Sequence, residues 1–307
     1  MTHLSGKIFQ SIPCFEDHLK MELGEFGEIE QIGDSLFHCN AEINTPIFWQ
    51  SNIWQKPFRF DFDSVSQAAA LLCEIQRNWA PVLFCCYRRA ELIKQKLPFI
   101  SAKPKSFPWT VPKAPMGAWT LLNEHSIIAS AECTSPFPGG AIEFEQNKTD
   151  PPSRAYLKLQ EALTFFKAIP KAGDKCFDAG AAPGGWTWVL LQLGSDVIAC
   201  DRSPLAPRLQ CARLEFIAHD AFTLNPKDIG KVDWLLCDVV CYPKRLLGWI
   251  QKWLESELCK NFVCTIKMQG DCDFETVKKF AAIPDSKVIH LYHNKHELTW
   301  IKQEGGF

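Results

Sequence analysis

In the second half of the chain, short apolar runs alternate with segments whose apolar residues recur at helical spacing. The apolar runs predict buried strands, and the longer periodic segments predict amphipathic helices between them. We expect strands at residues 175–178, 196–200, 214–218, 232–237, 262–266, 288–292 and 298–302, and helices at residues 153–166, 186–193, 243–258 and 274–283. This alternation indicates an α/β fold built on a mostly parallel, doubly wound sheet.

The first half of the chain has a less regular order of elements. We expect strands at residues 7–13, 29–40, 43–48 and 82–87, two more strands within residues 119–133, and helices at residues 15–26 and 65–79. This order indicates an α+β domain. Residues 101–115 hold four prolines and little periodicity, which predicts a linker or an extended segment. The loop at residues 134–152 predicts a boundary near Asp150, between domains at residues 1–150 and 151–307.

Composition narrows the class of protein. The chain has 307 residues, of which 47% are hydrophobic and 22% charged, and a net charge of −2, so no global basic field indicates a nucleic-acid partner. The fourteen cysteines include no Cys-x-x-Cys pair, so we expect neither a zinc site nor a disulfide framework. No apolar run is long enough to span a membrane. We therefore expect a cytoplasmic, monomeric protein with no metal and no membrane contact.

Basic and aromatic side chains lie together in one part of the first half. The basic residues are Arg88, Arg89, Lys94, Lys96, Lys103, Lys105 and Lys113, and the aromatic residues are Phe107, Trp109 and Trp119. Lysines and arginines attract phosphates and aromatic rings stack on bases, which favours contact with RNA. A solvated surface with a tethering loop explains the same residues almost as well. An earlier aromatic segment, residues 49–62, is more typical of a packed core.

A glycine-rich turn between the first expected strand and helix of the second half is the strongest local signal. It contains Gly180, Ala182, Pro183, Gly184 and Gly185. Glycines let backbone amides approach a ligand closely, and a strand–turn–helix of this kind seats nucleotide-like ligands. Asp201 ends the next strand, about 20 residues further on, where an acidic residue meets a ribose hydroxyl. The turn alone predicts an adenosine-bearing cofactor, and a tight turn without a ligand remains the alternative.

Polar residues stand at the carboxyl ends of the other expected strands as well. Asp178 and Asp201 stand at the ends of the first two strands, His219 and Asp220 follow the third, and Asp238 and Lys267 follow the fourth and fifth. A single polar residue after a strand is an ordinary solvent-facing cap. Because ligands bind beyond the carboxyl ends of such strands, a whole series at one edge predicts a site.

These residues resemble a known family. Residues 177–187 resemble motif I of S-adenosylmethionine-dependent methyltransferases, in the form Asp-x-Gly-Ala-x-Pro-Gly-Gly-Trp of the FtsJ-type ribose 2′-O-methyltransferases. That family also carries a Lys-Asp-Lys-Glu tetrad, which the resemblance assigns to Lys158, Asp238, Lys267 and Glu297. The implied fold is a Rossmann-like methyltransferase with S-adenosyl-L-methionine as its cofactor. The implied cofactor-binding residues are Gly180, Ala182, Pro183, Gly184, Gly185, Trp186, Asp201 at the ribose, Asp220 at the adenine, and Asp238.

Further segments indicate the branch of that family and its substrate. Residues 237–240, 251–254 and 291–293 resemble the branch that methylates a cytidine ribose in large-subunit (23S) ribosomal RNA. Residues 12–16 and the helix after them are similar to the start of RNA-modification enzymes that carry a THUMP domain. The resemblance therefore implies an RNA partner, 23S ribosomal RNA or a pre-ribosomal particle. It also implies an N-terminal RNA-presenting domain, THUMP-like and reduced because the middle section is short.

The implied reaction moves a methyl group from a sulfonium to a ribose 2′-hydroxyl. That hydroxyl is a poor nucleophile, so a general base must take its proton, and Lys267 is our candidate. Lys158 would position the hydroxyl, while Asp238 and Glu297 would orient the lysines. The alternatives are a messenger-RNA cap 2′-O-methyltransferase, and a non-catalytic RNA-binding or ribosome-assembly protein that keeps the fold. A dinucleotide-dependent oxidoreductase is a third, which Pro183 in the turn disfavours.

Overall fold

The computed structural model describes residues 1–307, which divide into two compact units. The first unit comprises Met1–Lys105 and Thr110–Glu143, and the second comprises Ser106–Trp109 and Phe144–Phe307. Residues 101–115, expected as an extended segment, contain no helix or strand. The chain thus passes between the units within this segment and again after Glu143, and the domain boundary near Asp150 stays a prediction.

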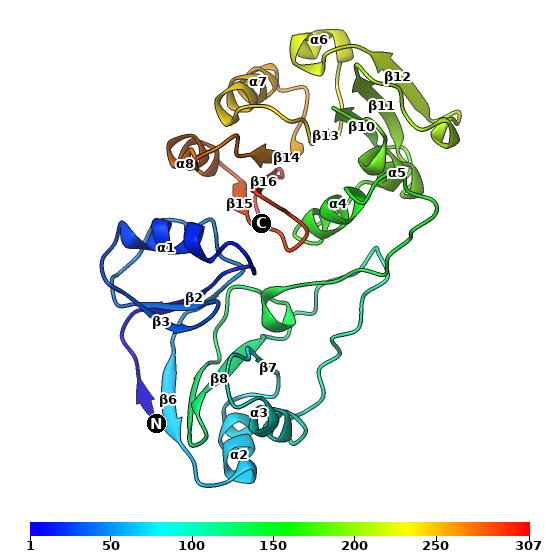
Figure 1. Ribbon diagram of the computed structural model, residues 1–307. Helices are drawn as coiled ribbons and strands as arrows, with labels where there is room; N and C mark the ends of the chain where they lie inside the picture. Colours follow the sequence, from blue (N-terminus) through cyan, green and yellow to red (C-terminus); the bar gives the residue numbers. More distant parts are fainter. The chain divides into compact units, whose positions relative to one another are not determined.

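The first unit holds two sheets (Figure 1). One sheet has the order β3-β4-β2-β5 and is antiparallel, with strands β2 (Lys7–Gln10), β3 (Ile29–Gly33), β4 (Leu36–Cys39) and β5 (Asn52–Trp54) and helix α1 (Glu16–Gly24). The other has the order β1-β6-β9-β8-β7, with strands β1 (Thr2–His3), β6 (Phe58–Asp61), β7 (Trp79–Pro81), β8 (Gly117–Asn123) and β9 (Ser126–Ser130) and helices α2 (Val65–Ile75) and α3 (Tyr87–Lys94). The α+β prediction for this part of the chain is confirmed.

Several local predictions in the first unit were wrong. The single strand expected at residues 29–40 is the antiparallel pair β3 and β4. Residues 43–48 form no strand, and at their end the buried carboxylate of Glu22 accepts the backbone N–H groups of Phe48 and of the next residue, Trp49, at 2.9 and 3.0 Å. Helix α2 ends at Ile75 rather than at Trp79, whose indole N–H donates to carbonyls of the last helical turns. The apolar run at residues 82–87 leads directly into α3 and is not a strand, since β7 precedes it.

Aromatic side chains of the first unit mostly build its core. Trp54, Phe58, Phe60 and Phe62 are buried, which confirms the core interpretation of the segment at residues 49–62. Trp119 in β8 is fully buried, so it does not present a ring for stacking on RNA. Fewer aromatic rings are therefore available for stacking on RNA bases beside the basic residues than the sequence suggested.

The second unit is built on a seven-stranded sheet of order β12-β11-β10-β13-β14-β16-β15. Its strands are β10 (Lys175–Ala179), β11 (Asp196–Asp201), β12 (Leu214–Ala218), β13 (Trp234–Cys237), β14 (Asn261–Lys267), β15 (Ser286–Ile289) and β16 (Glu297–Lys302). Neighbouring strands from β12 to β14 are parallel, and β16 runs antiparallel between β14 and β15. The mostly parallel sheet predicted for this part of the chain is confirmed.

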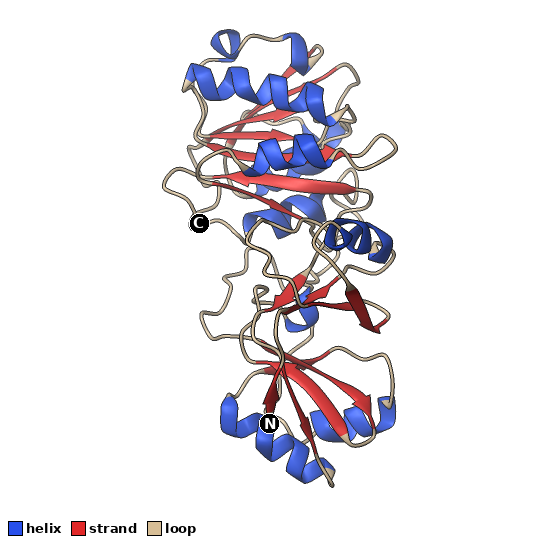
Figure 2. Cartoon of the chain, turned by 90° about the vertical axis from the view of Figure 1, so that its left-hand side faces the viewer, coloured by secondary structure: helices blue, strands red, loops and turns tan.

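Helices cover both faces of this sheet (Figures 1 and 2). Helices α4 (Tyr156–Leu163) and α5 (Gly185–Gln192) pack on each other, and α6 (Pro226–Ile229), α7 (Pro243–Ser256) and α8 (Phe274–Ala281) form a second group. Helix α4 begins later than the helix expected at residues 153–166, and Ala155 holds its N-cap position without a side-chain hydrogen bond. The strand order reverses between β10 and β13, the kind of crevice in which doubly wound proteins bind ligands.

The cysteines and the helices complete the description. All fourteen cysteines are free thiols. None of the helices combines the length and the apolar character needed to span a bilayer.

Candidate active site at the carboxyl ends of the central strands

The glycine turn follows β10 and is shaped by close contacts. Gly180 has a φ of +75°, and a Cβ atom there would lie 2.1 Å from Cγ2 of Val239, in the loop after β13. Gly184 has a φ of +111°, and its Cβ would lie 2.1 Å from Cδ1 of Leu209. At both positions the positive φ favours glycine, and a Cβ atom would overlap a neighbouring side chain that would have to move.

A buried carboxylate anchors the same turn. Asp178 in β10 is 1% exposed, and the hydroxyl of Thr187 in α5 donates to its Oδ2 at 2.6 Å. Burial raises the pKa of Asp178 from 3.8 to about 7, against the opposing effect of the Thr187 hydrogen bond. The contact ties the strand before the turn to the helix after it.

Asp201 and Asp220 lie at the ends of the next two strands. Asp201 accepts hydrogen bonds from the backbone N–H of Ala182 at 3.0 Å and of Ser203 at 2.8 Å. Asp220 accepts from the N–H of Phe222 at 3.0 Å. Asp201 thus connects the end of β11 directly to the glycine turn.

A cavity of about 270 Å³ opens between these strand ends. It is lined by Gly180, Ala182, Cys200, Asp201, Arg202, His219, Asp220, Ala221, Asp238, Val239 and Val240. Five of the predicted cofactor-binding residues are among them, and their carboxylates come from three different strands. Such a concave site with a few convergent polar groups is typical of small-molecule binding.

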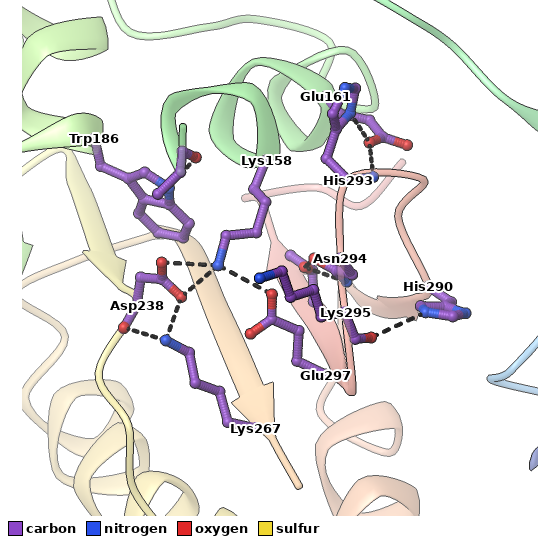
Figure 3. A network of polar contacts seen from close by, with 12 residues as sticks. Lys158, Glu161, Trp186, Asp238, Lys267, His290, His293, Asn294, Lys295 and Glu297 are labelled. Atoms are coloured by element: carbon purple, nitrogen blue, oxygen red, sulfur yellow. Dashed lines mark hydrogen bonds and ion pairs between the residues drawn. The ribbon is translucent and has the colours of Figure 1, made fainter. Parts of the chain in front are cut away.

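Asp238 connects this cavity to a cluster of charged side chains (Figure 3). Nζ of Lys158, from α4, lies 2.9 and 2.8 Å from the two carboxylate oxygens of Asp238 and 3.0 Å from Oε1 of Glu297. Burial by itself lowers the pKa of Lys158, but the two carboxylates outweigh it and the net pKa is raised. All three N–H groups of this ammonium thus have carboxylate acceptors.

Lys267, the last residue of β14, is bound differently. Its Nζ donates to the main-chain oxygen of Asp238 at 2.7 Å and lies 2.9 Å from Oδ1 of the same residue. Glu297 is its register partner on the antiparallel strand β16. The structure therefore brings all four residues of the predicted tetrad together, with side chains that are only 10–16% exposed.

The part of the chain that carries this site is similar to a known protein family. Residues 151–296 match the model of the FtsJ-like methyltransferase family. This part of the chain is an FtsJ-like methyltransferase domain. It contains the glycine turn, the cavity and three of the four tetrad residues, and Glu297 is the residue that directly follows the matched region.

Relatives of the chain have names that concern ribosomal RNA. The ribosomal RNA large subunit methyltransferase M of Azoarcus sp. (strain BH72) is 32% identical over 182 residues, which are 54% of this chain and 49% of that protein. The protein of the same name from Halorhodospira halophila is 37% identical over 157 residues, 48% of this chain and 46% of that protein. The chain therefore spans about half the length of the curated relatives it matches.

A solved structure is also similar, at a lower level. The fibrillarin pre-rRNA processing protein of Methanococcus jannaschii is 19% identical, with a TM-score of 0.36 over 49% of this chain and 75% of that chain.

Some predicted cofactor residues of the FtsJ-like domain lie outside the cavity lining. These are Pro183, Gly184, Gly185 and Trp186. The indole of Trp186 is 3% exposed and donates to the carbonyl of Ala155 at 2.9 Å, so in this structure it joins α5 to the residue before α4. Their roles at a cofactor stay predictions.

The structure also reveals site residues that the sequence did not. Arg245 of α7 lies 3.3 Å from Oδ2 of Asp220 and stacks over the ring of Phe222, 4.8 Å from its centroid. Arg202 lines the cavity directly, as does His219, which the sequence had already placed after the third strand. The position of Arg202 beside a strand end was a signal that could have identified it, whereas Arg245 required the packing of α7.

Proposed function

We propose that the chain transfers a methyl group from S-adenosylmethionine to a ribose 2′-hydroxyl of ribosomal RNA. The observation that carries this proposal is the cluster of Lys158, Asp238, Lys267 and Glu297 beside the cavity of an FtsJ-like domain. Two lysines and two carboxylates in contact can hold a hydroxyl, take its proton and stabilise the charge that develops. A protein that only bound RNA would have no use for this arrangement.

The cavity suits the proposed cofactor. Its carboxylates Asp201 and Asp220 are acceptors for the ribose hydroxyls and the adenine amino group, and Gly180 in the lining allows close approach. When bound, S-adenosylmethionine supplies a methyl group already activated by the positive charge of its sulfur. Asp238 lines the cavity and binds both lysines, so the methyl donor and the proton acceptor would share one carboxylate.

Hydrogen-bond geometry distinguishes the roles of the two lysines. The ammonium of Lys158 has three acceptor oxygens, two on Asp238 and one on Glu297, and its pKa is raised. It therefore remains a cation that positions the hydroxyl and stabilises developing negative charge. Lys267 has two oxygen acceptors, both on Asp238. A neutral amine keeps both of these bonds with its two hydrogens and turns its lone pair toward the substrate. Lys267 is therefore the general base of the proposal.

The substrate class follows from the relatives and from the basic segment of the first unit. The relatives named ribosomal RNA large subunit methyltransferase M are similar to this chain over about half of their own length. We propose large-subunit 23S ribosomal RNA, free or in a pre-ribosomal particle, as the substrate and a cytidine as the target. The first unit, as a reduced THUMP-like domain, would present the RNA through exposed basic side chains such as Arg88, Lys96 and Lys103. A cytoplasmic monomer belongs to the same proposal.

Mapping of ribose methylation tests the substrate. Large-subunit ribosomal RNA is isolated from cells with and without the gene, and each position is scored for 2′-O-methylation. We expect one position to lose its methyl group in the deletion strain and to regain it on complementation. An unchanged ribosomal RNA profile would refute the proposed substrate.

Substitution of Lys267 by Ala tests the base. The variant should bind S-adenosylmethionine with unchanged affinity in calorimetric titration and lose methyl transfer by a factor of about 10² to 10⁴, the usual contribution of a general base. The control is Lys260→Ala, an exposed lysine just before the other end of the same strand, β14, which should retain full activity. Substantial transfer by the Lys267 variant would exclude this lysine as the base.

A further inference from the structure

A second buried carboxylate lies one helical turn beyond Lys158 on α4. Glu161 is 3% exposed and accepts three hydrogen bonds, all from one turn of the chain (Figure 3). Its Oε1 accepts from the N–H of Tyr292 at 2.8 Å. Its Oε2 accepts from the N–H of His293 at 3.0 Å and from Nδ1 of the same imidazole at 2.7 Å. The carboxylate is therefore fully engaged with the 292–293 turn.

Packing alone does not explain a buried carboxylate such as that of Glu161. A carboxylate removed from water is strongly destabilising unless several donors surround it, and here three donors do so. Residues three positions apart on a helix lie on the same side, so Glu161 and Lys158 extend from neighbouring positions of α4. The same helix thus carries a member of the tetrad and the anchor of a distant loop.

The anchored turn leads directly to the tetrad. Asn294 and Thr299 exchange hydrogen bonds of 3.1 and 3.2 Å across the start of β16. The N–H of Glu297 donates to the carbonyl of Lys295 at 2.8 Å, which bends the chain tightly just before the strand. The segment from the Glu161 contact to Glu297 therefore has few free torsions, and Oε1 of Glu297 ends 3.0 Å from Nζ of Lys158.

We propose that Glu161 is a positioning residue for methyl transfer: by holding Tyr292 and His293 against α4, it sets the carboxylate of Glu297 at the ammonium of Lys158. The inference rests on the proposed function, because it assigns Glu161 to the reaction of the same site. Glu161 does not contact the tetrad itself. It acts through the turn, and its loss would leave the four residues present but misplaced.

Glu161→Gln tests this role with minimal change of shape. A glutamine has one acceptor oxygen, so its NH₂ group must face N–H donors of the turn, and at least one contact becomes repulsive. We expect kcat for an unmodified large-subunit ribosomal RNA transcript to fall by about tenfold to a hundredfold. The KM for RNA and the affinity for S-adenosylmethionine should stay within about twofold of the wild type.

The matched control is Gln303→Ala. Gln303 is also a buried polar residue of the same unit, and it lies just beyond the other end of β16, where it accepts from the N–H of Lys167 at 3.1 Å and donates to the carbonyl of Gly306. Its loss removes two hydrogen bonds far from the tetrad. We expect a lowered melting temperature with an unchanged kcat, which separates positioning from general loss of stability.

A pair of variants at His293 keeps the inference testable if the Glu161 variant does not fold. His293→Ala removes one of the three donors and should lower kcat severalfold. His293→Asn returns an N–H donor near the place of Nδ1 and should restore most of the lost kcat. A kcat that is unchanged in Glu161→Gln, equally reduced in Gln303→Ala, or not restored by His293→Asn would overturn the inference.

A crystal structure of the Glu161 variant separates this inference from the proposed function. We expect the contact between Lys158 and Glu297 to lengthen beyond hydrogen-bonding distance, and an unchanged contact would also overturn the inference. If the wild-type chain methylates no ribosomal RNA, the proposed function fails, whereas the displacement of Glu297 in the crystal still supports the positioning role.

Discussion

Replacing Asp178 by Asn should change how the stability of the protein depends on pH. The carboxyl group is buried in β10 beneath the glycine turn and accepts a hydrogen bond from Thr187. Asparagine has nearly the same shape, offers an oxygen to the same hydroxyl and carries no charge at any pH. The substitution therefore removes the ionisation of the group while it retains the contact.

The magnitude follows from the raised pKa. Burial raises the pKa of Asp178 from 3.8 to about 7, so the folded protein binds this proton more tightly than the unfolded chain does. The resulting stability is fully present below pH 3.8 and is lost as the pH rises through about 7. At about 1.4 kcal/mol per pH unit, the full loss is at most about 4 kcal/mol, of which about 2–3 kcal/mol falls between pH 5 and pH 8.

Urea unfolding at pH 5, 6, 7 and 8, followed by circular dichroism, measures the effect. We expect the Asp178→Asn variant to gain stability relative to the wild type by about 2–3 kcal/mol over this range. Asp196→Asn, which removes an exposed carboxylate at the start of β11, controls for the change in net charge. A stability difference that stays constant from pH 5 to pH 8 would refute the argument, because it would mean that the folded protein has already lost the Asp178 proton below pH 5 and that the pKa is not raised to about 7.

Two further substitutions test the charged cluster and the cavity. Lys158→Met leaves the carboxylates of Asp238 and Glu297 side by side, so we expect it to abolish methyl transfer and to lower the unfolding free energy by about 3 kcal/mol. Adding Glu297→Gln should return part of that stability but no activity, and a double variant no more stable than Lys158→Met would contradict the ion-pair explanation. Asp201→Asn keeps an acceptor for the glycine turn and loses the charge, so S-adenosylmethionine should bind about tenfold more weakly in calorimetric titration, about 1.4 kcal/mol. Unchanged affinity would exclude Asp201 from the cofactor site.

The sheet that carries the site could be predicted from local pattern. The strands β10, β11, β13 and β14 are mostly buried runs bounded by turn residues, and hydrophobic burial favours such elements without help from distant parts of the chain. The edge strands β12 and β15 contain no fully buried residue. Contacts with distant side chains could not be predicted in this way. The carboxylate of Glu22 binds the N–H groups of Phe48, the last residue of the strand expected at residues 43–48, and of Trp49, and no local pattern around those residues contains Glu22.

The residues of the site also fall into those that local pattern predicted and those that it did not. The aspartates at the carboxyl ends of β10, β11 and β13 were visible from the strand ends alone, because parallel strands bring their carboxyl ends to one edge. Lys158 was not, since it is an ordinary helix residue whose partner, Asp238, is 80 residues away in the sequence. Only the resemblance to a family selected it. Glu161 was missed entirely, because its partners lie 131 and 132 residues further along the chain.

The two lysines of the tetrad illustrate what the structure adds to a motif. In the sequence both are lysines of one signature, and nothing in their spacing says which one takes the proton. In the structure Lys158 gives all its N–H groups to carboxylates, whereas Lys267 binds only Asp238, through the main-chain oxygen and Oδ1. A lysine that acts as a base must first lose a proton without losing its orientation, and Lys267 keeps two acceptors with one position left over, which is why we propose it as the base. The proposed division of roles therefore depends on how many oxygens each amine faces, which strand order and the position of Glu297 determine.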